Sequence, residues 1–228
     1  MYKMPNAPDI RQLFPDRVFT ACCRIEDKDY VLRREEYDAV KDAVTKRRNE
    51  FGAGRMCAQA ALELQGTKGF VLVRNPDGST AWPTGIIGTI SHSDLWCGAA
   101  VARQSDYAGI GFDIEALDRI THKIAKRVLI DREMDWVSRQ PGDENGKWFT
   151  LMFSAKESIY KCLSPLVGGD IRFSDAEIIP SVDGRSFKTR LTEKISSRVP
   201  SSLILRGRYL LHEEEMFSGV VLIKKQAP

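Results

Sequence analysis

Short stretches rich in apolar and β-branched residues, separated by turn residues, predict several β-strands. In the first half of the chain these stretches are "VFTACCRI" (18–25), "GIIGTISHS" (85–93) and "WCGAAVAR" (96–103). In the second half they are "YAGIGFDIEAL" (107–117), "RFSDAEII" (172–179), "SFKTRL" (186–191), "LILRGRYLL" (203–211) and "FSGVVLIKK" (217–225). Residues 68–83 predict two more strands around a type I turn, because "NPDG" sets Pro and Asp at its centre and Gly after them.

Helical character covers three longer segments. The first spans residues 33–66, where we expect a break near Gly52 and Gly54 and an end at Gly66. The second spans residues 122–137, and the polar stretch "SRQPGDENGK" (138–147) after it is typical of a disordered loop. Helices and strands thus occur in both halves, and the sequence predicts an α+β fold.

The third predicted helix, over residues 149–163, separates two kinds of side chain. Apolar residues recur at helical spacing on the face expected to meet the core: Met152, Ala155, Ile159 and Cys162. Ser154, Glu157 and Lys161 fall on nearly the opposite face. Because Glu157 and Lys161 are four residues apart, one interpretation is a simple surface ion pair worth about 0.3–0.5 kcal/mol.

The connection "QSDYAG" (104–109) is polar and ends in Gly, and it is the expected boundary between two halves, 1–106 and 107–228. The composition is that of a globular protein, with 43% hydrophobic and 29% charged residues. There is no run of eighteen apolar residues and no secretory signal, so we expect neither a transmembrane segment nor export, and a cytoplasmic location. Five cysteines without metal-site spacing predict free thiols. The net charge of +3 gives no argument for nucleic acid binding.

The motif "GFDIE" sets two acids in an apolar strand. Because strand side chains alternate, Asp113 and Glu115 lie on one face of the strand and Phe112 and Ile114 on the other. Two like charges on one buried face repel each other and lose hydration, so they require a compensating partner. Together with Glu157 they would form an all-oxygen site for Mg²⁺, which prefers carboxylates, water and phosphate oxygens.

Two further motifs carry groups suited to phosphate. "GTISHS" offers the hydroxyls of Thr89, Ser91 and Ser93 and the imidazole of His92 at a predicted strand end, although a structural histidine is the alternative. "RRNEFGAGR" adds the guanidinium groups of Arg47, Arg48 and Arg55, a residue type that binds phosphate in bidentate fashion. A solvated basic surface is the simpler explanation of such runs.

Four blocks, "RRNEFGAGRMCAQAAL", "WPTGIIGTISHS", "GFDIE" and "FSAKESIYK", stand in this order between residues 47 and 161. In combination they resemble the 4′-phosphopantetheinyl transferases, in particular the Sfp-like group and its branch typified by enterobactin synthase component D. The resemblance implies two similar α+β halves related by a pseudo-twofold axis, with the active site in the cleft between them. It also implies a Mg²⁺-dependent enzyme that moves the phosphopantetheine arm of coenzyme A onto a serine of an acyl or peptidyl carrier protein.

The resemblance assigns roles to individual positions. Asp113, Glu115 and Glu157 match the metal ligands, with the backbone carbonyl of Ile114 assisting. The positions expected to contact the phosphates of coenzyme A are Arg47 or Arg48, Arg55, Ser91, His92, Lys156 and Lys161. The segment expected at the nucleotide end is Arg74, Asn75, Pro76 and Asp77. Relatives commonly carry an "REP"-like triplet before "WP", whereas this chain has Gly78, Ser79 and Thr80, which puts the nucleotide contacts of this loop in question.

The resemblance also implies a mechanism. Lys161 and the cation stabilise the charge that develops as the carrier serine attacks the β-phosphoryl group and 3′,5′-ADP leaves. Glu157 is the expected acceptor of the serine proton, with Asp113 as the alternative. The basic segment "RITHKIAKRV" (119–128) is a candidate surface for an acidic carrier, and a monomer is expected. The alternatives are another Mg²⁺-dependent phosphotransferase or nucleotidyl transferase, and a non-catalytic module that binds coenzyme A or a carrier.

Overall fold

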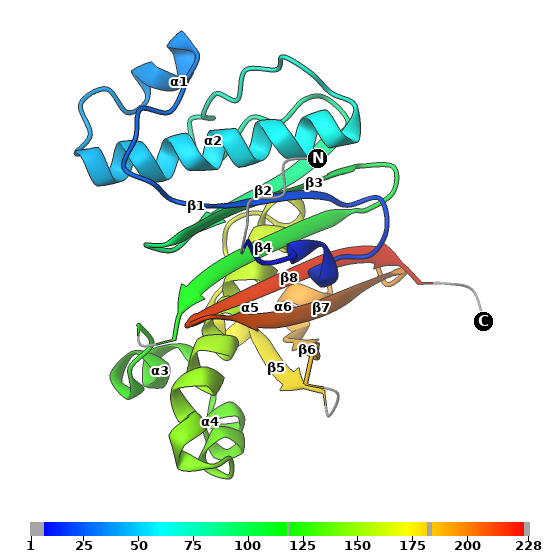
Figure 1. The fold of residues 1–228 in the computed structure, drawn as a ribbon. Helices are drawn as coiled ribbons and strands as arrows, with labels where there is room; N and C mark the ends of the chain where they lie inside the picture. Colours follow the sequence, from blue (N-terminus) through cyan, green and yellow to red (C-terminus); the bar gives the residue numbers. More distant parts are fainter. Residues whose placement is uncertain (1–6, 118, 182–183, 226–228) are drawn as a thin grey trace.

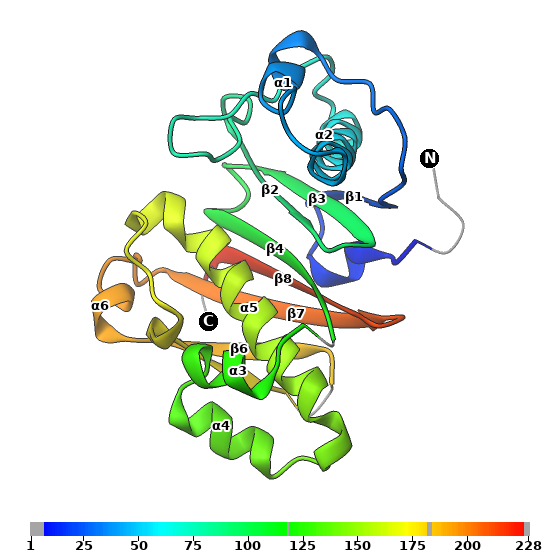
Figure 2. The same ribbon diagram turned by 90° about the vertical axis from the view of Figure 1, so that its left-hand side faces the viewer.

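The computed structural model describes residues 7–117, 119–181 and 184–225. Two antiparallel sheets are present, one with the strand order β1-β3-β2 and one with the order β4-β8-β7-β6-β5. One long helix, α2, packs on the smaller sheet, and a second, α5, packs on the larger one (Figures 1 and 2). The predicted α+β class in two halves is confirmed, although the halves differ in their number of strands. The expected segments 1–106 and 107–228 include residues 1–6, 118, 182–183 and 226–228, which lie outside the described residues.

The first half confirms its three predicted strands. Its elements are η1 (Ile10–Leu13), β1 (Phe19–Arg24), α1 (Arg34–Asp38), α2 (Thr45–Gln65), β2 (Ile86–His92) and β3 (Trp96–Arg103). The expected break near Gly52 and Gly54 is wrong, because α2 runs through both residues. These glycines permit close packing: a Cβ atom on Gly52 would overlap Tyr30, and one on Gly54 would lie 3.2 Å from Ile90 Cγ2. The predicted end at Gly66 is confirmed, with φ 103°.

The segment 68–83 contains the predicted turn but not the predicted strands. Gly78 N donates to Asn75 O over 2.9 Å, which closes the turn. The only bridge of this segment within the described residues joins Arg74 and Thr80. Asp77 Oδ1 accepts bonds from the Ser79 backbone and hydroxyl groups at 2.9 and 2.6 Å, and these bonds lower its pKa. The loop is therefore held by its own backbone and side-chain hydrogen bonds and is a strand of neither sheet.

The second half confirms the remaining strand predictions. Its elements are β4 (Gly109–Ala116), α3 (His122–Val128), α4 (Asp131–Ser138), η2 (Gly142–Glu144), α5 (Asn145–Val167), η3 (Phe173–Asp175), β5 (Ala176–Pro180), β6 (Ser186–Leu191), α6 (Glu193–Ser196), β7 (Leu203–His212) and β8 (Glu215–Lys224). The single helix expected over 122–137 is wrong: the chain is extended at Ile130, whose N–H donates to Glu133 Oε2 over 2.9 Å and begins α4. The loop expected over 138–147 is also shorter, because α5 begins at Asn145.

The two faces of strand β4 pack against different parts of the protein. Ile110, Phe112 and Ile114 belong to a core shared with η1, β3 and β8. On the opposite face, Cβ atoms on Gly109 and Gly111 would collide with the carbonyl oxygens of Cys162 and Ser158 on α5. The helix backbone therefore rests directly on β4, and the acids farther along the strand meet its side chains.

The predicted faces of α5 are confirmed in part. Met152, Ala155, Ile159 and Cys162 are buried as expected. Ser154, expected on the polar face, is fully buried, and its hydroxyl lies 2.8 Å from that of Ser218 on β8. The helix is enclosed on more sides than an amphipathic pattern predicts, because small glycine positions of β4 draw it close to the sheet.

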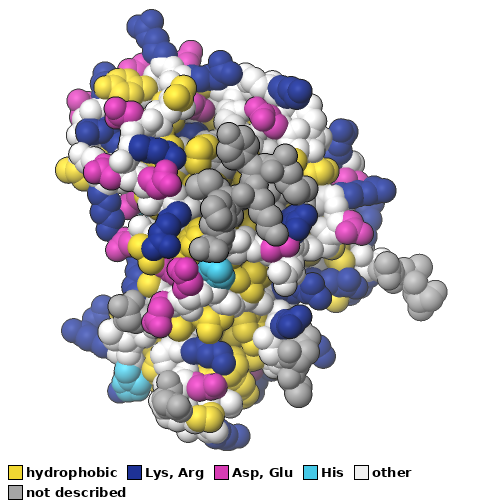
Figure 3. Space-filling model, viewed as in Figure 1, with side chains coloured by type: hydrophobic (Ala, Val, Ile, Leu, Met, Phe, Trp, Pro, Cys, Tyr) yellow, Lys and Arg dark blue, Asp and Glu magenta, His cyan; other side chains and the backbone are white. Residues whose placement is uncertain are grey.

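Other surface features are unremarkable. On the face seen in Figure 3, Lys and Arg side chains lie among Asp and Glu side chains, and hydrophobic side chains reach the surface below the centre. None of the helices within the described residues is long and apolar enough to span a bilayer.

Candidate functional site

The centre of the site is a hydrogen-bonded cluster of Ser91, Asp113 and Lys161. Lys161 Nζ lies 2.7 Å from Asp113 Oδ1, and Ser91 Oγ donates to the same oxygen over 2.9 Å. The ammonium group also donates to Ser91 Oγ over 2.9 Å and to the Phe112 carbonyl over 3.2 Å. These residues come from β2, β4 and α5, so the cluster joins the two halves. Lys161 is one of the compensating partners that the paired acids require.

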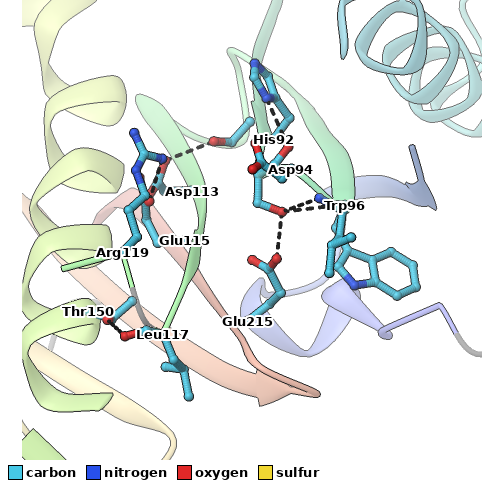
Figure 4. Close-up of polar contacts among 12 residues, drawn as sticks. His92, Asp94, Trp96, Asp113, Glu115, Leu117, Arg119, Thr150 and Glu215 are labelled. Atoms are coloured by element: carbon cyan, nitrogen blue, oxygen red, sulfur yellow. Dashed lines mark hydrogen bonds and ion pairs between the residues drawn. The ribbon is translucent and has the colours of Figure 1, made fainter. Parts of the chain in front are cut away.

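Glu115 has a different partner, which the sequence analysis did not identify. Arg119 Nη1 lies 2.8 Å from Glu115 Oε2, and Figure 4 shows the guanidinium group folded back over the end of β4. Burial, and next the charge of Asp113, raise the pKa of Glu115 to about 7. Asp113 and Glu115 therefore lie on one face of β4, as the alternation of strand side chains predicts, and the charge of Asp113 acts on Glu115.

Glu157 is half-buried on α5, one turn before Lys161. Burial raises the pKa of its carboxyl group, and the charge of Asp113 raises it further, whereas Lys161 lowers it. Glu157 lines a groove of about 490 Å³ together with Lys156, Tyr160 and Arg172. Its carboxylate thus lies within electrostatic reach of Asp113 and next to an open groove.

The donor set fits a hard cation. One oxygen of Asp113, Oδ2, is buried and has no hydrogen-bond partner among the residues that the structure describes, a costly state that a bound cation would relieve. Asp113, Glu115 and Glu157 supply only oxygen ligands, and the charge of Asp113 raises the pKa of both glutamates in addition to burial, the larger cause. Within the described ranges, however, no three acidic, histidine or cysteine side chains already converge on one metal position. Lys161 and Arg119 are paired with two of the carboxylates instead.

His92 belongs to a charged cluster at the end of β2. Its Nε2 atom lies 3.3 Å from Arg47 Nη1 and 3.7 Å from Glu50 Oε2. Arg47 Nη1 and Glu50 Oε2 are 3.2 Å apart. Arg48, considered together with Arg47 from the sequence, points elsewhere: it donates to Ala43 O over 2.6 Å, at the start of α2. The structure thus brings Arg47, and not Arg48, to the histidine.

Arg55 is a buried arginine with unused hydrogen-bonding capacity. It is 5% exposed, its guanidinium carbon lies 4.3 Å from the centre of the Phe51 ring, and its Nε atom has no partner in the described part of the chain. Burial, opposed by the charge of Glu36 and assisted by the charges of Arg74 and Arg47, lowers its pKa to about 10. Arg74 lies 5.9 Å from the same ring, so three cations surround this part of α2. Such a concentration of positive charge favours an anionic ligand.

A cleft of about 750 Å³ separates the two halves near this cluster. The loop Asn75–Thr80, strand β2, the start of β4 and the second half of α5 line it, and Lys161 is part of its wall. Thr80 is part of the same wall and accepts a bond from Arg55 Nη1 over 3.5 Å. Tyr160 borders both this cleft and the groove beside Glu157. Pro76 is exposed in the turn of the loop.

Lys156, expected from the sequence to reach a phosphate, is buried in the interior. Its ammonium group forms an ion pair with Glu133 at 2.8 Å, in which both side chains are 1% exposed. The same group donates to the carbonyl oxygens of Phe173 and Val128 at 2.8 and 3.2 Å. All three of its N–H bonds are used inside the protein, so Lys156 connects α4 and α5 in this conformation and does not face Asp113.

Sequence reasoning missed several residues that shape the site. Arg119 follows the metal-type motif by only four residues, and that spacing was an available signal for a partner of Glu115. Glu50 gave no signal, because its approach to His92 depends on how α2 packs on β2. Ser93 accepts bonds from Leu95 N and Trp96 N and donates to Glu215 Oε1 over 3.0 Å (Figure 4). Ser93 therefore holds the turn after His92.

Comparison with known proteins gives consistent matches over most of the chain. Residues 35–102 match the 4'-phosphopantetheinyl transferase N-terminal domain, and residues 109–212 match the 4'-phosphopantetheinyl transferase superfamily. The 4'-phosphopantetheinyl transferase Svp of Streptomyces mobaraensis is 35% identical over 170 residues, covering 73% of this chain and 68% of that protein. PptT of Mycobacterium tuberculosis is 28% identical over 194 residues, covering 82% of this chain and 85% of that protein.

Two further proteins are also similar. Enterobactin synthase component D of Escherichia coli (strain K12) is 33% identical over 150 residues, covering 63% of this chain and 66% of that protein. Among solved structures, a holo-(acyl-carrier-protein) synthase from Bacillus anthracis in complex with CoA (3',5'-ADP) is 23% identical. The match covers 53% of this chain and 99% of that one, with a TM-score of 0.43.

Proposed function

Since the chain belongs to the 4′-phosphopantetheinyl transferase family, we propose that the groups around Asp113 and Lys161 are its transfer site. The protein is an enzyme that moves phosphopantetheine from coenzyme A to a carrier protein. One observation supports the location most strongly: a buried carboxylate oxygen without a partner, Asp113 Oδ2, lies beside the cleft-lining Lys161 where the halves meet.

We propose that Asp113, Glu115 and Glu157 hold a Mg²⁺ ion, with the Ile114 carbonyl assisting. The ion would supply positive charge to the pyrophosphate oxygens during transfer. Glu115 supports this proposal, because burial and the charge of Asp113 disfavour its ionised form in the metal-free protein. A bound cation would compensate that charge. Binding the ion would require Asp113 and Glu115 to turn partly away from Lys161 and Arg119.

For coenzyme A we propose the cationic rim of the cleft. Arg47, Arg55 and His92 would bind phosphate groups, and Ser91 and Lys161 would lie at the pyrophosphate. Arg74 and the loop residues Asn75, Pro76 and Asp77 would lie at the nucleotide end. Two features support this assignment: the unpaired Nε of buried Arg55, and the cleft wall that Lys161 shares with Asn75 and Asp77. We leave Lys156 out of the phosphate set, because its donors are used by Glu133 and two carbonyl groups.

The transfer step then involves two residues of α5. The carrier serine oxygen forms a bond to the β-phosphorus, the bond from that phosphorus to the bridging oxygen breaks, and 3′,5′-ADP leaves. Lys161 stabilises the negative charge that develops on the phosphoryl and bridging oxygens. The serine proton passes to the carboxylate of Glu157, and its raised pKa makes this carboxylate a stronger base than an exposed one. Asp113 is the alternative acceptor.

The remaining proposals concern organisation and partner. We propose that the halves 1–106 and 107–228 meet at the active-site cleft; the gap between the two family matches, at residues 103–108, supports this boundary. Helix α3, with Lys123 and Lys126, is proposed to face an acidic carrier. A cytoplasmic monomer is proposed as well, and the five free thiols are compatible with a reducing compartment.

Mass spectrometry of an apo carrier protein, incubated with the enzyme, coenzyme A and Mg²⁺, tests the proposal. We expect the carrier to gain the phosphopantetheine group with the native protein and to gain none with Glu157→Gln, whose fold should be intact by circular dichroism. Glu144→Gln, at the end of η2, is the matched control, because Glu144 is also a half-buried glutamate. Near-normal transfer by Glu157→Gln would remove that residue from the mechanism. Turnover of a nucleoside triphosphate without a carrier would favour another phosphotransferase, and ligand binding without any transfer would favour a binding module.

A further inference from the structure

Arg119 covers a buried carboxylate from the solvent side. It lies four residues after Glu115, and its Nη1 atom is 2.8 Å from Glu115 Oε2. The arginine side chain is 60% exposed, whereas the glutamate side chain is 7% exposed. Figure 4 shows that the guanidinium group reaches the carboxylate from the segment after β4. An exposed cation thus lies on a buried anion.

Each of the two acids of β4 forms an ion pair with one basic side chain of the protein, but the two basic side chains differ in their other contacts. Lys161 is 27% exposed and donates to Ser91, the Phe112 carbonyl and Asp113, so it is anchored in the wall of the site. For the Arg119 side chain, Glu115 is the sole hydrogen-bonding or ionic partner within the described segments. Loss of that one contact would return the guanidinium group to water at little cost to the arginine, which is already 60% exposed, provided that a bound cation compensates the buried charge of Glu115.

A guanidinium group and a divalent cation cannot share this place without repulsion. Both are attracted by the same carboxylates, and the charge of Arg119 also acts on Glu157. A doubly charged ion gains more than a singly charged one from the neighbouring carboxylates of Asp113, Glu115 and Glu157. Binding of the ion should therefore break the contact between Arg119 and Glu115, because this pair is more exposed than the pair of Lys161 and Asp113.

We propose that Arg119 takes the place of the metal ion on Glu115 in the metal-free protein and is displaced into solvent when the ion binds. This inference rests on the proposed metal site. It makes Arg119 a residue that sets the affinity for metal, since each binding event must first break its ion pair with Glu115. The alternative is that Arg119 keeps its hydrogen bond to Glu115 in the metal-bound state. In that case Arg119 would increase the affinity for the metal ion.

Calorimetric titration of the full chain with MgCl₂, without coenzyme A and at pH 8, distinguishes the two roles. We expect Arg119→Gln to bind Mg²⁺ about three- to tenfold more tightly than the native protein, because the competing ion pair and its repulsion are gone. Arg190→Gln is the matched control, because Arg190 is also 60% exposed and pairs with Glu177 at 2.6 Å. An unchanged or weaker affinity in Arg119→Gln would overturn the inference.

A second measurement follows the displaced side chain directly. In a ¹H–¹⁵N spectrum of the native protein, the Nε–H signal that disappears in Arg119→Lys belongs to Arg119. Addition of Mg²⁺ should move this signal to the position of a free arginine and leave that of Arg190 in place; a signal that Mg²⁺ does not move would contradict displacement. Binding of Mg²⁺ by the native protein with no effect of Arg119 would refute this inference alone. No binding of Mg²⁺ by any variant, together with absent transfer, would refute the proposed function.

Discussion

Lys161 Nζ and Asp113 Oδ1, 48 residues apart in the chain, lie 2.7 Å from each other, and the carboxylate side of this pair is 4% exposed. Replacing Lys161 by Met would leave a buried charge without its partner. We expect Lys161→Met to lower the free energy of unfolding by about 2–4 kcal/mol in metal-free buffer, as measured by urea denaturation. It should also abolish transfer.

The double variant tests the cause of that loss. In Asp113→Asn/Lys161→Met the buried carboxylate is gone, so most of the lost stability should return. A double variant as unstable as Lys161→Met would mean that the packing of the lysine stem, and not its charge, stabilises this region.

Arg55 should contribute mainly to the binding of coenzyme A. Its unpaired Nε atom and low exposure suggest an unfilled anion site, so Arg55→Ala should raise KM for coenzyme A about tenfold or more and lower kcat by much less. Steady-state kinetics at saturating carrier protein measure both constants.

Arg48→Ala provides the comparison, because Arg48 donates to Ala43 O and Thr45 Oγ1 at the start of α2. Its KM for coenzyme A should remain within about twofold of the native value. If Arg48→Ala had the larger effect, the assignment of Arg47 and Arg55 to the phosphate site would be wrong.

Glu115 should make the stability of the metal-free protein depend on pH. Its pKa is about 7 in the folded chain and 4.5 in the unfolded one, so the folded state binds the proton more tightly. The contribution of Glu115 to the free energy of unfolding is fully present below pH 4.5 and is lost as the pH rises through 7. With EDTA present, the unfolding free energy of the native protein should fall between pH 5 and pH 8 by on the order of 2 kcal/mol relative to Glu115→Gln.

Added Mg²⁺ should restore that stability at pH 8 in the native protein only. Glu144→Gln, which also removes one charge, should retain the native pH dependence. Parallel curves for Glu115→Gln and the native protein would show that this carboxyl group titrates normally.

Gly111 should tolerate no side chain. A Cβ atom there would overlap the Ser158 carbonyl oxygen of α5, and backbone atoms cannot turn aside. We expect Gly111→Ala to lower the melting temperature strongly, with a loss of about 3 kcal/mol or more, and to reduce transfer. Gly142→Ala, where no atom lies within 4 Å of the new Cβ, should keep the native melting temperature.

The site could be predicted from sequence as far as local periodicity determines it. Alternation along β4 sets Asp113 and Glu115 on one face, and helical spacing sets Glu157 and Lys161 one turn apart. Contacts that depend on tertiary packing were not accessible. Glu50 meets His92 only because α2 packs on β2, and Lys156 meets Glu133 only because α4 folds back on α5.

The errors in the predicted elements have a similar origin. Gly52 and Gly54 lower helix propensity, yet α2 continues through them because packing against Tyr30 and Ile90 requires small residues. The apolar residues around the turn at 75–78 are typical of strands, but the segment is a strand of neither sheet and forms a single bridge among the described residues. In each case the surrounding structure overrides the local preference.

The two faces of β4 also limit how this protein can change during evolution. Inserting or deleting one residue within Gly109–Ala116 would exchange the faces, turning Phe112 and Ile114 toward α5 and the acids toward the apolar core. Loss of catalysis and loss of folding would then coincide. Length variation in this enzyme should accordingly be confined to its connecting loops, and the spacing from Gly109 to Glu115 should be fixed.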